Sequence, residues 1–277
     1  MSRLPNFLYV GPDKAGSSWL HEVLLKHPDV YLTPAKDLYF FDRYYDRGLE
    51  WYASQFRDAR DERIVGEVCQ DYLFHPEAAD RIHETLGPVR IMVSLRDPVE
   101  RAWSSYLYMR KHGIGPDSFG EALHSRPELL EHGRYATGLD RFLQRLPREM
   151  VHVALFDDLA ADPQAFLDSV TDFLDIGRLP LESKDLEARL PAARARSVRL
   201  ASMARRSADW VRLHDGATVV GRVKRSPLVQ RALYRPLDRA AVRPDPADVI
   251  TVRNALAPEI QALERTLGLR LGEAWGW

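Results

Sequence analysis

The sequence predicts an α/β fold in which a parallel β-sheet is flanked by helices. Short continuous apolar runs, typical of buried parallel strands, alternate with stretches of helical apolar spacing. The 277 residues are 45% hydrophobic and 29% charged, which is enough apolar material for a full core. From residue 189 the pattern changes to helical segments rich in Ala, Arg and Leu. We therefore expect one domain over residues 1–277, with an α/β core at 1–188 and a mainly helical, arginine-rich cap with a C-terminal helix at 189–277.

Four apolar runs are the predicted strands: Phe7–Val10, Ile64–Val65, Arg90–Leu95 and Val151–Phe156. Apolar residues three and four apart predict helices at Ser17–His27, after Asp97-Pro98, and after Asp157-Asp158 through Leu174. In the cap only Thr218–Val223 resembles a strand, and an amphipathic helix is expected over Ala247–Leu267.

Several protein classes are excluded by composition. No stretch approaches the roughly 20 apolar residues of a membrane helix. The single cysteine, Cys69, allows no internal disulfide and no cysteine-rich metal site. The N-terminal residues have neither the apolar core nor the cleavage site of a secretory signal, so a cytoplasmic location is expected.

Charge is distributed unevenly along the chain. Residues 189–243 contain 13 arginines and one lysine against three aspartates, a net charge of +11 within a chain of net charge −1. This segment would either contact something anionic or form solvated helix faces that pair with the acidic remainder. It has no recognisable RNA-binding or helix-turn-helix signature and few aromatic residues, so no nucleic-acid partner is expected.

The strongest chemical signal is the loop GPDKAGSSW after the first predicted strand. A loop that opens a helix in this way directs backbone N–H groups at a tetrahedral anion such as phosphate or sulfate. The spacing of Gly11 and Gly16 is P-loop-like, but a nucleotide-binding P-loop has lysine directly after the second glycine, where this chain has Ser17. Lys14 lies inside the loop instead, which disfavours a kinase or ATPase. The alternative is a glycine-rich turn without a ligand.

A second set of polar residues lies in SLRDPVERAWSSY. Arg96 ends a predicted strand at the sheet edge where open α/β sheets bind ligands, and Ser104 follows on the next helix. A guanidinium and a hydroxyl suit a second phosphate. Alternatively, Arg96 pairs with Asp97 or Glu100 at the start of the helix.

Together the two segments resemble the 5′-phosphosulfate loop and the 3′-phosphate motif of sulfotransferases that use 3′-phosphoadenosine 5′-phosphosulfate (PAPS). The similarity is to the heparan sulfate sulfotransferase-like branch and its bacterial relatives. Further similar stretches are KDLYFFDRYYDRGLEWYASQF, GEVCQDYL and LFDDLAADPQAFLDSVTDFL, so the resemblance covers most of Met1 to Ile176.

The resemblance implies a nucleotide site that requires no metal, with PAPS as donor and 3′-phosphoadenosine 5′-phosphate (PAP) as product. Lys14 would contact the bridging oxygen, and the loop from Ala15 through Gly16, Ser17 and Ser18 to Trp19 would hold the 5′-phosphate. Arg96 and Ser104 would hold the 3′-phosphate. Tyr135 matches a family position near the nucleotide, although it could equally be a packed aromatic residue.

The base that deprotonates the acceptor is less well defined. In the heparan-like branch a glutamate before a Phe-Phe pair has this role, and Asp37 stands in its place here, one methylene shorter. Glu67, at the end of a predicted strand, is the second candidate because we expect it to face the cleft. A histidine such as His112 is a third.

The leading hypothesis is a cytoplasmic bacterial sulfotransferase acting on a hydroxyl or amine of a glycan, glycolipid or secondary metabolite. The basic segment indicates an anionic acceptor. The terminal helix could either pack on the body of the protein or contact a second copy in a homodimer. The alternatives are a nucleotide kinase, separated by Mg²⁺ dependence, and a non-catalytic anion-binding protein on the same scaffold.

Overall fold

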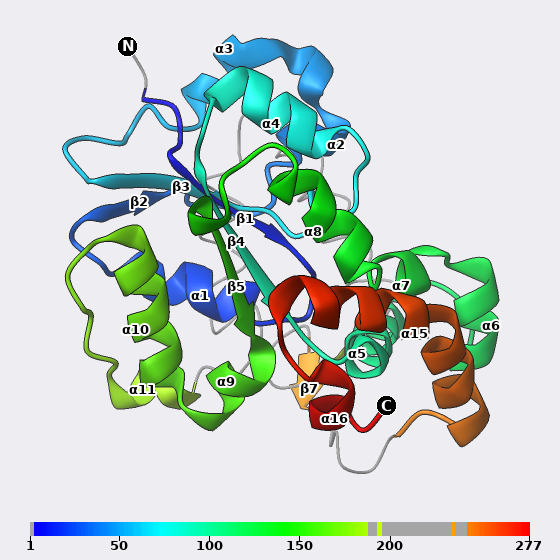
Figure 1. Cartoon of the computed structure of the whole chain (residues 1–277). Coiled ribbons are helices and arrows are strands. Elements are labelled where there is room, and N and C mark those ends of the chain that lie inside the picture. The colour runs from blue at the N-terminus through cyan, green and yellow to red at the C-terminus, as the bar shows by residue number, and fades with distance from the viewer. Residues whose placement is uncertain (1–2, 188–192, 196–233, 237–242) are drawn as a thin grey trace.

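The computed structural model describes residues 3–187, 193–195, 234–236 and 243–277 (Figure 1). Its centre is a five-stranded sheet of order β2-β3-β1-β4-β5 in which every pair is parallel. The strands are β1 Phe7–Gly11, β2 Val30–Leu32, β3 Ile64–Val68, β4 Arg90–Leu95 and β5 Val151–Leu155. The parallel sheet and its four expected strands are confirmed, and β2 is an additional strand at one edge.

Helices cover both faces of the sheet because successive strand residues point to opposite sides. In β1, Leu8 and Val10 pack into one apolar cluster, whereas Phe7 and Tyr9 pack into the other. The second cluster is covered by α1 Ser17–Leu24, α9 Phe156–Ala161 and α10 Pro163–Leu174. The first lies under α2 Phe40–Arg43, α3 Gly48–Ser54, α4 Ala78–Leu86 and α8 Tyr135–Leu143, with short 3-10 turns at Tyr45–Arg47 and Arg148–Met150.

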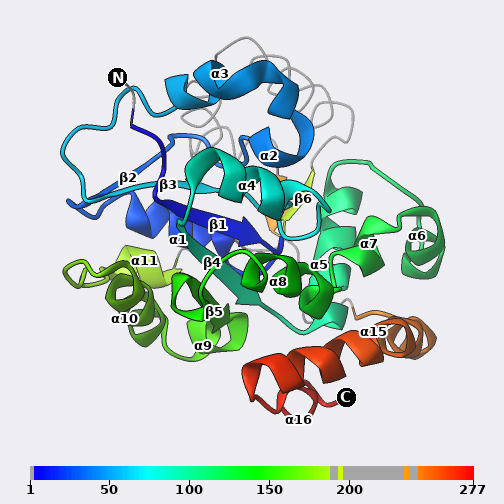
Figure 2. The same cartoon turned by 45° about the horizontal axis from the view of Figure 1, so that its top comes forward.

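The helices that follow β4 lie beside the C-terminal helix (Figure 2), and a third apolar cluster joins them. It is formed by α5 Pro98–Lys111, α6 Phe119–Ser125, α7 Glu128–Glu131 and α15 Pro246–Leu267. The last helix, α16 Leu271–Trp275, packs into the first cluster. Glu259 of α15 accepts hydrogen bonds from the backbone N–H (3.0 Å) and hydroxyl (2.6 Å) of Thr137 on α8. The expected C-terminal helix is confirmed, and its apolar residues pack into two of the three clusters.

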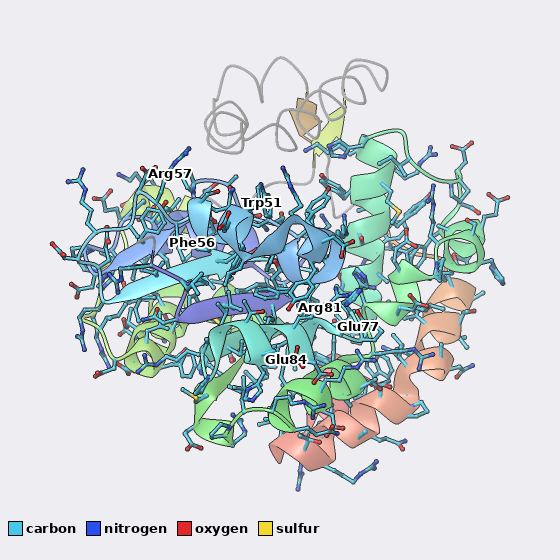
Figure 3. The ribbon with its side chains drawn as sticks, turned by 90° about the horizontal axis from the view of Figure 1, so that it is seen from above. Trp51, Phe56, Arg57, Glu77, Arg81 and Glu84 are labelled. Carbon is cyan, nitrogen blue, oxygen red and sulfur yellow. The ribbon has the colours of Figure 1, made fainter. Side chains whose placement is uncertain are left out.

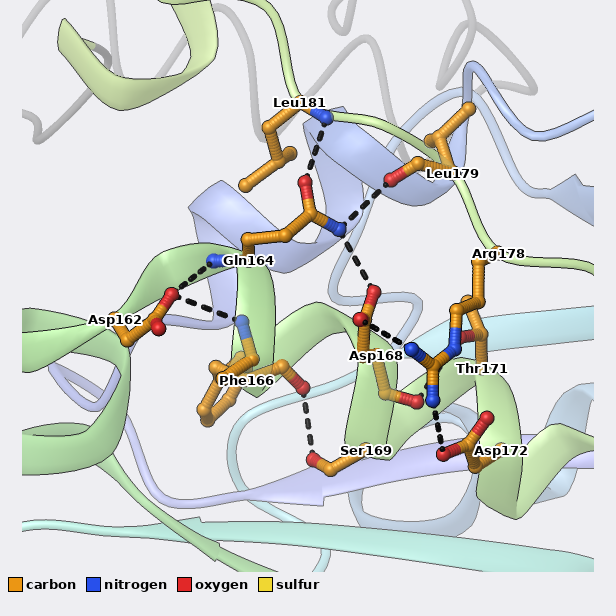
Figure 4. A network of polar contacts seen from close by, with 11 residues as sticks. Asp162, Gln164, Phe166, Asp168, Ser169, Thr171, Asp172, Arg178, Leu179 and Leu181 are labelled. Atoms are coloured by element: carbon orange, nitrogen blue, oxygen red, sulfur yellow. Dashed lines mark hydrogen bonds and ion pairs between the residues drawn. The ribbon is translucent and has the colours of Figure 1, made fainter.

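A polar network fixes the chain between α10 and α11 Ser183–Glu187 (Figure 4). Asp162 caps α10 by accepting from the N–H groups of Gln164 and Ala165. The Gln164 side chain donates to Leu179 O (3.2 Å) and accepts from Leu181 N (2.9 Å), and Arg178 pairs with Asp168 and Asp172. Beyond this network, Asp185 O accepts from Trp19 Nε1 (2.9 Å), and the Asp185 carboxylate pairs with Lys26. The segment thereby anchors α1.

Most of the basic segment, including the expected strand Thr218–Val223, lies outside the described residues. Two short strands within it are described, β6 Ala193–Ala195 and β7 Tyr234–Pro236, and they pair antiparallel. The division into core and cap therefore stays a prediction. In the part of the chain that the structure describes, no helix combines the length and the apolar composition needed to span a bilayer.

Candidate active site

The loop after β1 presents an uncapped helix N-terminus. The backbone hydrogen bonds of α1 begin with Leu20 N–H donating to Gly16 O (3.0 Å), so the amides of Ser17, Ser18 and Trp19 precede them. Gly16, at the N-cap position, has no side chain that could accept a hydrogen bond from these amides, and the first turn contains no acidic residue. These amides, together with the helix dipole, form a site that favours an anion.

Glycine is required at both ends of this loop. Gly11 has φ +132°, and a Cβ there would lie 2.5 Å from Gln70 O. Gly16 has φ +94°, and a Cβ there would lie 2.6 Å from Leu159 Cδ2. Both conformations are strained for other residues, so the backbone path depends on these two glycines.

Three cationic side chains surround the loop. Lys36 Nζ donates to the hydroxyls of Ser17 (2.9 Å) and Ser18 (3.3 Å). Arg96 Nη1 donates to Lys14 O at 3.1 Å. Burial lowers the pKa of Lys14 to about 8, although neighbouring Asp13 opposes the shift. The structure therefore concentrates positive charge where the helix dipole already favours an anion.

Hydrogen bonds at the end of β4 hold the loop and the Arg96 backbone in place. Ser94 Oγ donates to Ala15 O (2.8 Å), and the fully buried Tyr135 donates from its hydroxyl to Arg96 O (2.9 Å). Arg96 also pairs with the exposed Glu100 at 3.2 Å, whereas Asp97 caps α5 by accepting from Val99 N. Tyr135 is thus a packed aromatic residue that holds the Arg96 backbone.

The other two residues expected to bind the nucleotide, Ser104 and Trp19, differ in which of their groups are available to a ligand. Ser104 is partly exposed on α5, and its hydroxyl makes no hydrogen bond to any described residue. The Trp19 side chain is buried, donates to Asp185 O and packs edge-on against Phe166. Trp19 can therefore contact a ligand at this loop through its backbone amide but not through its side chain.

A buried ion pair beneath the loop was not identified from the sequence. Arg101, with a fully buried side chain, donates to Asp13 Oδ1 (2.9 Å) and to Leu129 O. Ser105 donates to Asp13 Oδ2 (3.0 Å), and His132 Nδ1 lies 3.7 Å from Asp13 Oδ1. Burial would raise the pKa of Asp13, but Arg101 and the His132 hydrogen bond hold it well below its ordinary value. This charged network fixes the residue that precedes Lys14.

Asp37 lies beside the same loop in an unusual environment. Its φ is +64°, and its backbone N–H donates to Val68 O at 2.8 Å, which ties it to the end of β3. Its Oδ2 lies 3.8 Å from Lys36 Nζ, while its buried Oδ1 has no hydrogen-bond partner among the described residues. A buried carboxylate oxygen without a donor is unfavourable, so it marks a position suited to an incoming proton donor.

Glu67 does not face the cleft, contrary to the expectation from sequence. Its side chain is fully buried, and its two oxygens accept from Tyr52 OH and Tyr72 OH, each at 2.8 Å. Burial raises its pKa to about 8, although these hydrogen bonds and one from the Leu38 backbone oppose the shift. Tyr72 OH also accepts from Phe40 N–H (2.8 Å). Glu67 therefore supports the turn that carries Asp37.

The third candidate base, His112, is also engaged elsewhere. It is a buried residue whose Nδ1 lies 2.8 Å from Tyr108 O and whose ring lies 4.2 Å from the Tyr108 ring. Of the three candidates, Asp37 alone has an unpartnered oxygen beside the anion site.

A pocket of about 470 Å³ lies between α2, the segment that follows β3 and the α7–α8 region. Asp71 lines this pocket; burial raises the pKa of Asp71 to about 6, and the negative charges of Asp37 and Asp13 contribute. The pocket reaches the loop through His132, whose Nδ1 lies 3.7 Å from Asp13 Oδ1. Its lining residues are Asp42, Arg43, Asp71, Phe74, His75, Pro76, Glu131, His132, Arg134, Thr137 and Arg141.

Comparison with known proteins matches this chain to sulfotransferases. Human heparan sulfate glucosamine 3-O-sulfotransferase 6 is 33% identical over 192 residues, covering 64% of this chain and 54% of that protein. The crystal structure of a sulfotransferase from Alicyclobacillus acidocaldarius is 30% identical and superposes with a TM-score of 0.60 over 67% of this chain and 89% of that one. Mouse sulfotransferase SULT7A1, complexed with PAP, shares the fold at 14% identity, with a TM-score of 0.53 over 99% of this chain and 88% of that one.

The chain spans about half, or less, of the length of the curated relatives that it matches. The family model described as the sulfotransferase domain matches residues 4–194, which include the anion-binding loop, Asp37 and the Arg96 segment. The chain therefore belongs to the sulfotransferase domain family.

Proposed function

We propose that this protein transfers the sulfuryl group of PAPS to a hydroxyl or amine of an acceptor. The observation that carries the proposal is the uncapped N-terminus of α1, surrounded by Lys14, Lys36 and Arg96. Sulfuryl transfer needs reactants held in line and negative charge stabilised on the departing phosphate, and this arrangement supplies fixed dipoles and cations for that purpose. Family membership and the PAP complex of a protein with the same fold support it.

The nucleotide would be held at both of its phosphate groups. The amides of Ser17, Ser18 and Trp19 would bind the 5′-phosphate, with Lys36 beside them. Arg96, just before α5, and Ser104, in the middle of α5, would bind the 3′-phosphate, and Arg96 would then exchange or share its contact with the exposed Glu100. Because a bidentate guanidinium fits a phosphate well, this contact would separate PAPS from nucleotides without a 3′-phosphate.

The reaction needs a base for the acceptor and a cation for the leaving group. Asp37, with its unpartnered Oδ1, would accept the proton from the attacking hydroxyl or amine. Lys36 Nζ lies 3.8 Å from Asp37 Oδ2 and would hold this carboxylate in place beside the loop. The Lys14 ammonium would stabilise the charge that develops on the departing phosphate oxygen.

The acceptor would enter the pocket lined by Asp71 and His132, because His132 lies 3.7 Å from Asp13 of the loop and the charge of Asp37 acts on Asp71. A glycan acceptor is supported by similarity to the heparan sulfate enzymes, whose names specify a glucosamine acceptor. A glycolipid or another hydroxylated metabolite would use the same chemistry.

The test is transfer of ³⁵S from labelled PAPS to a panel of sugars, amino sugars and hydroxylated metabolites, with and without a metal chelator. We expect a sulfated acceptor and PAP in equal amounts, unaffected by the chelator, and strongly reduced transfer in Lys14→Met. Lys184→Met, which replaces an exposed lysine outside the site, is the matched control. Magnesium-dependent phosphate transfer from ATP to an acceptor would contradict the proposal.

A further inference from the structure

The Lys14 side chain ends on the face of an aromatic ring. Its Nζ lies 3.6 Å from the centroid of the Tyr108 ring on α5. Among the described residues, Nζ makes no hydrogen bond and no ion pair. An ammonium this close to a ring centroid is attracted by the electron-rich face of the ring. The ring is therefore the described group that holds the Lys14 ammonium in place.

The surrounding charges do not replace this contact. Asp13 and Asp37 favour the charged form of Lys14, while Lys36 and Lys111 disfavour it, and burial has the largest effect. Asp13 is held by Arg101 and Ser105. Asp37 is ion-paired with Lys36 through Oδ2. The two nearby carboxylates are thus directed at other partners.

A ring has an advantage over a carboxylate at this position. A carboxylate paired with Lys14 would neutralise it and would have to be displaced by an anionic ligand. A ring attracts the ammonium without cancelling its charge, so the cation stays available to an arriving anion. Tyr108 also lies four residues after Ser104, so the ring and the serine hydroxyl share one face of α5.

We propose that Tyr108 is a positioning residue for Lys14. The face of the Tyr108 ring keeps the Lys14 ammonium charged and holds it beside the N-terminus of α1. The part that Tyr108 would play in catalysis rests on the proposed sulfuryl transfer, whereas its effect on Lys14 does not. Tyr108 as a whole is 41% exposed, and the centroid of its ring lies 4.2 Å from that of the His112 ring.

The experiment places phenylalanine and then mono-, di- and trifluorophenylalanine at position 108 of the full chain. Fluorine withdraws electron density from the ring face while nearly preserving its shape, so a purely steric role would give a flat series. The readout is the titration of Lys14 in the ligand-free protein, followed by NMR of ¹³C-labelled lysine and assigned with Lys14→Arg. Lys184, which is exposed, is the internal control.

We expect Tyr108→Phe to keep the Lys14 pKa and fluorination to lower it stepwise, by about half a unit to one unit across the series. A fall from about 8 to about 7 would reduce the charged fraction at about pH 7.5, and with it the PAPS transfer rate, roughly threefold. Tyr108→Leu should lower transfer at least as much, and Tyr108→Phe should restore it.

The two readouts separate the two proposals. If Lys14 titrates identically throughout the series, the role of Tyr108 is overturned, even where wild-type protein transfers sulfate. If the Lys14 pKa falls with fluorination but no acceptor is ever sulfated, the ring contact stands and the proposed function fails.

Discussion

Replacing Glu67 by glutamine should remove a pH-dependent loss of stability. In the folded protein burial raises the pKa of Glu67 from 4.5 to about 8. As the pH rises from 4.5 towards 8, the unfolded chain releases this proton while the folded chain retains it. The carboxyl therefore contributes its full stability below pH 4.5 and loses it progressively up to pH 8.

The size of the effect follows from the pKa difference. At about 1.4 kcal/mol per unit, the wild type loses about 5 kcal/mol of unfolding free energy through this group over that range. Glutamine cannot ionise, so Glu67→Gln should escape this loss. Its amide can still meet the two hydroxyls, with Oε1 accepting from Tyr52 and Nε2 donating to Tyr72.

The assay is urea unfolding followed by tryptophan fluorescence at several pH values between 5 and 9. The quantity compared is the change in unfolding free energy with pH. Altered hydrogen bonding would change the unfolding free energy by the same amount at every pH, so it does not affect this comparison. The control is Glu84→Gln, an exposed carboxyl of α4 (Figure 3). Parallel curves for wild type and Glu67→Gln would refute the conclusion that folding holds this carboxyl protonated.

Three further substitutions test the site. Asp37→Asn should lower transfer by about 100-fold or more while PAP affinity is kept, as kinetics and calorimetry would show; an equal loss of PAP affinity would contradict its role as base. Lys36→Met should weaken PAP binding by about 10- to 100-fold in calorimetry, because a charge-assisted contact is lost, and unchanged affinity would count against that contact. Arg101→Met should destabilise the protein by about 3–5 kcal/mol in urea unfolding, because it leaves Asp13 buried and unpaired. Adding Asp13→Asn should recover part of this loss, and simple additivity would refute the coupling.

The fold was predictable where a strand is a continuous apolar run. β1, β4 and β5 are such runs, and each was expected within a residue or two of its observed ends. β2 has three residues at the sheet edge, with half-exposed Tyr31 between buried Val30 and Leu32, so its local pattern is weak. In β3 the expectation stopped at Val65 because Gly66 and Glu67 interrupt the apolar run.

The site was predictable where it is local and not where it depends on tertiary partners. The loop around Lys14 and the Arg96 segment carry their own spacing, and the structure brings them together through the Arg96 contact with Lys14 O. Burial of Glu67 depends on Tyr52 and Tyr72, which are neighbours only in the fold. The contact of Lys36 with two serines of α1, and the buried pair of Asp13 and Arg101, likewise join distant segments and leave no signal in local sequence.

The most direct test of the central claim is calorimetric titration with PAP and with ADP, at physiological salt and without metal, on the wild type and on Arg96→Ala. We predict that the wild type binds PAP and not ADP. The variant should lose about 1.5–3 kcal/mol of PAP binding, as expected for a charge-assisted phosphate contact. Equal binding of the two nucleotides, or no binding of either, would contradict the assignment of two phosphate sites to the loop after β1 and the start of α5.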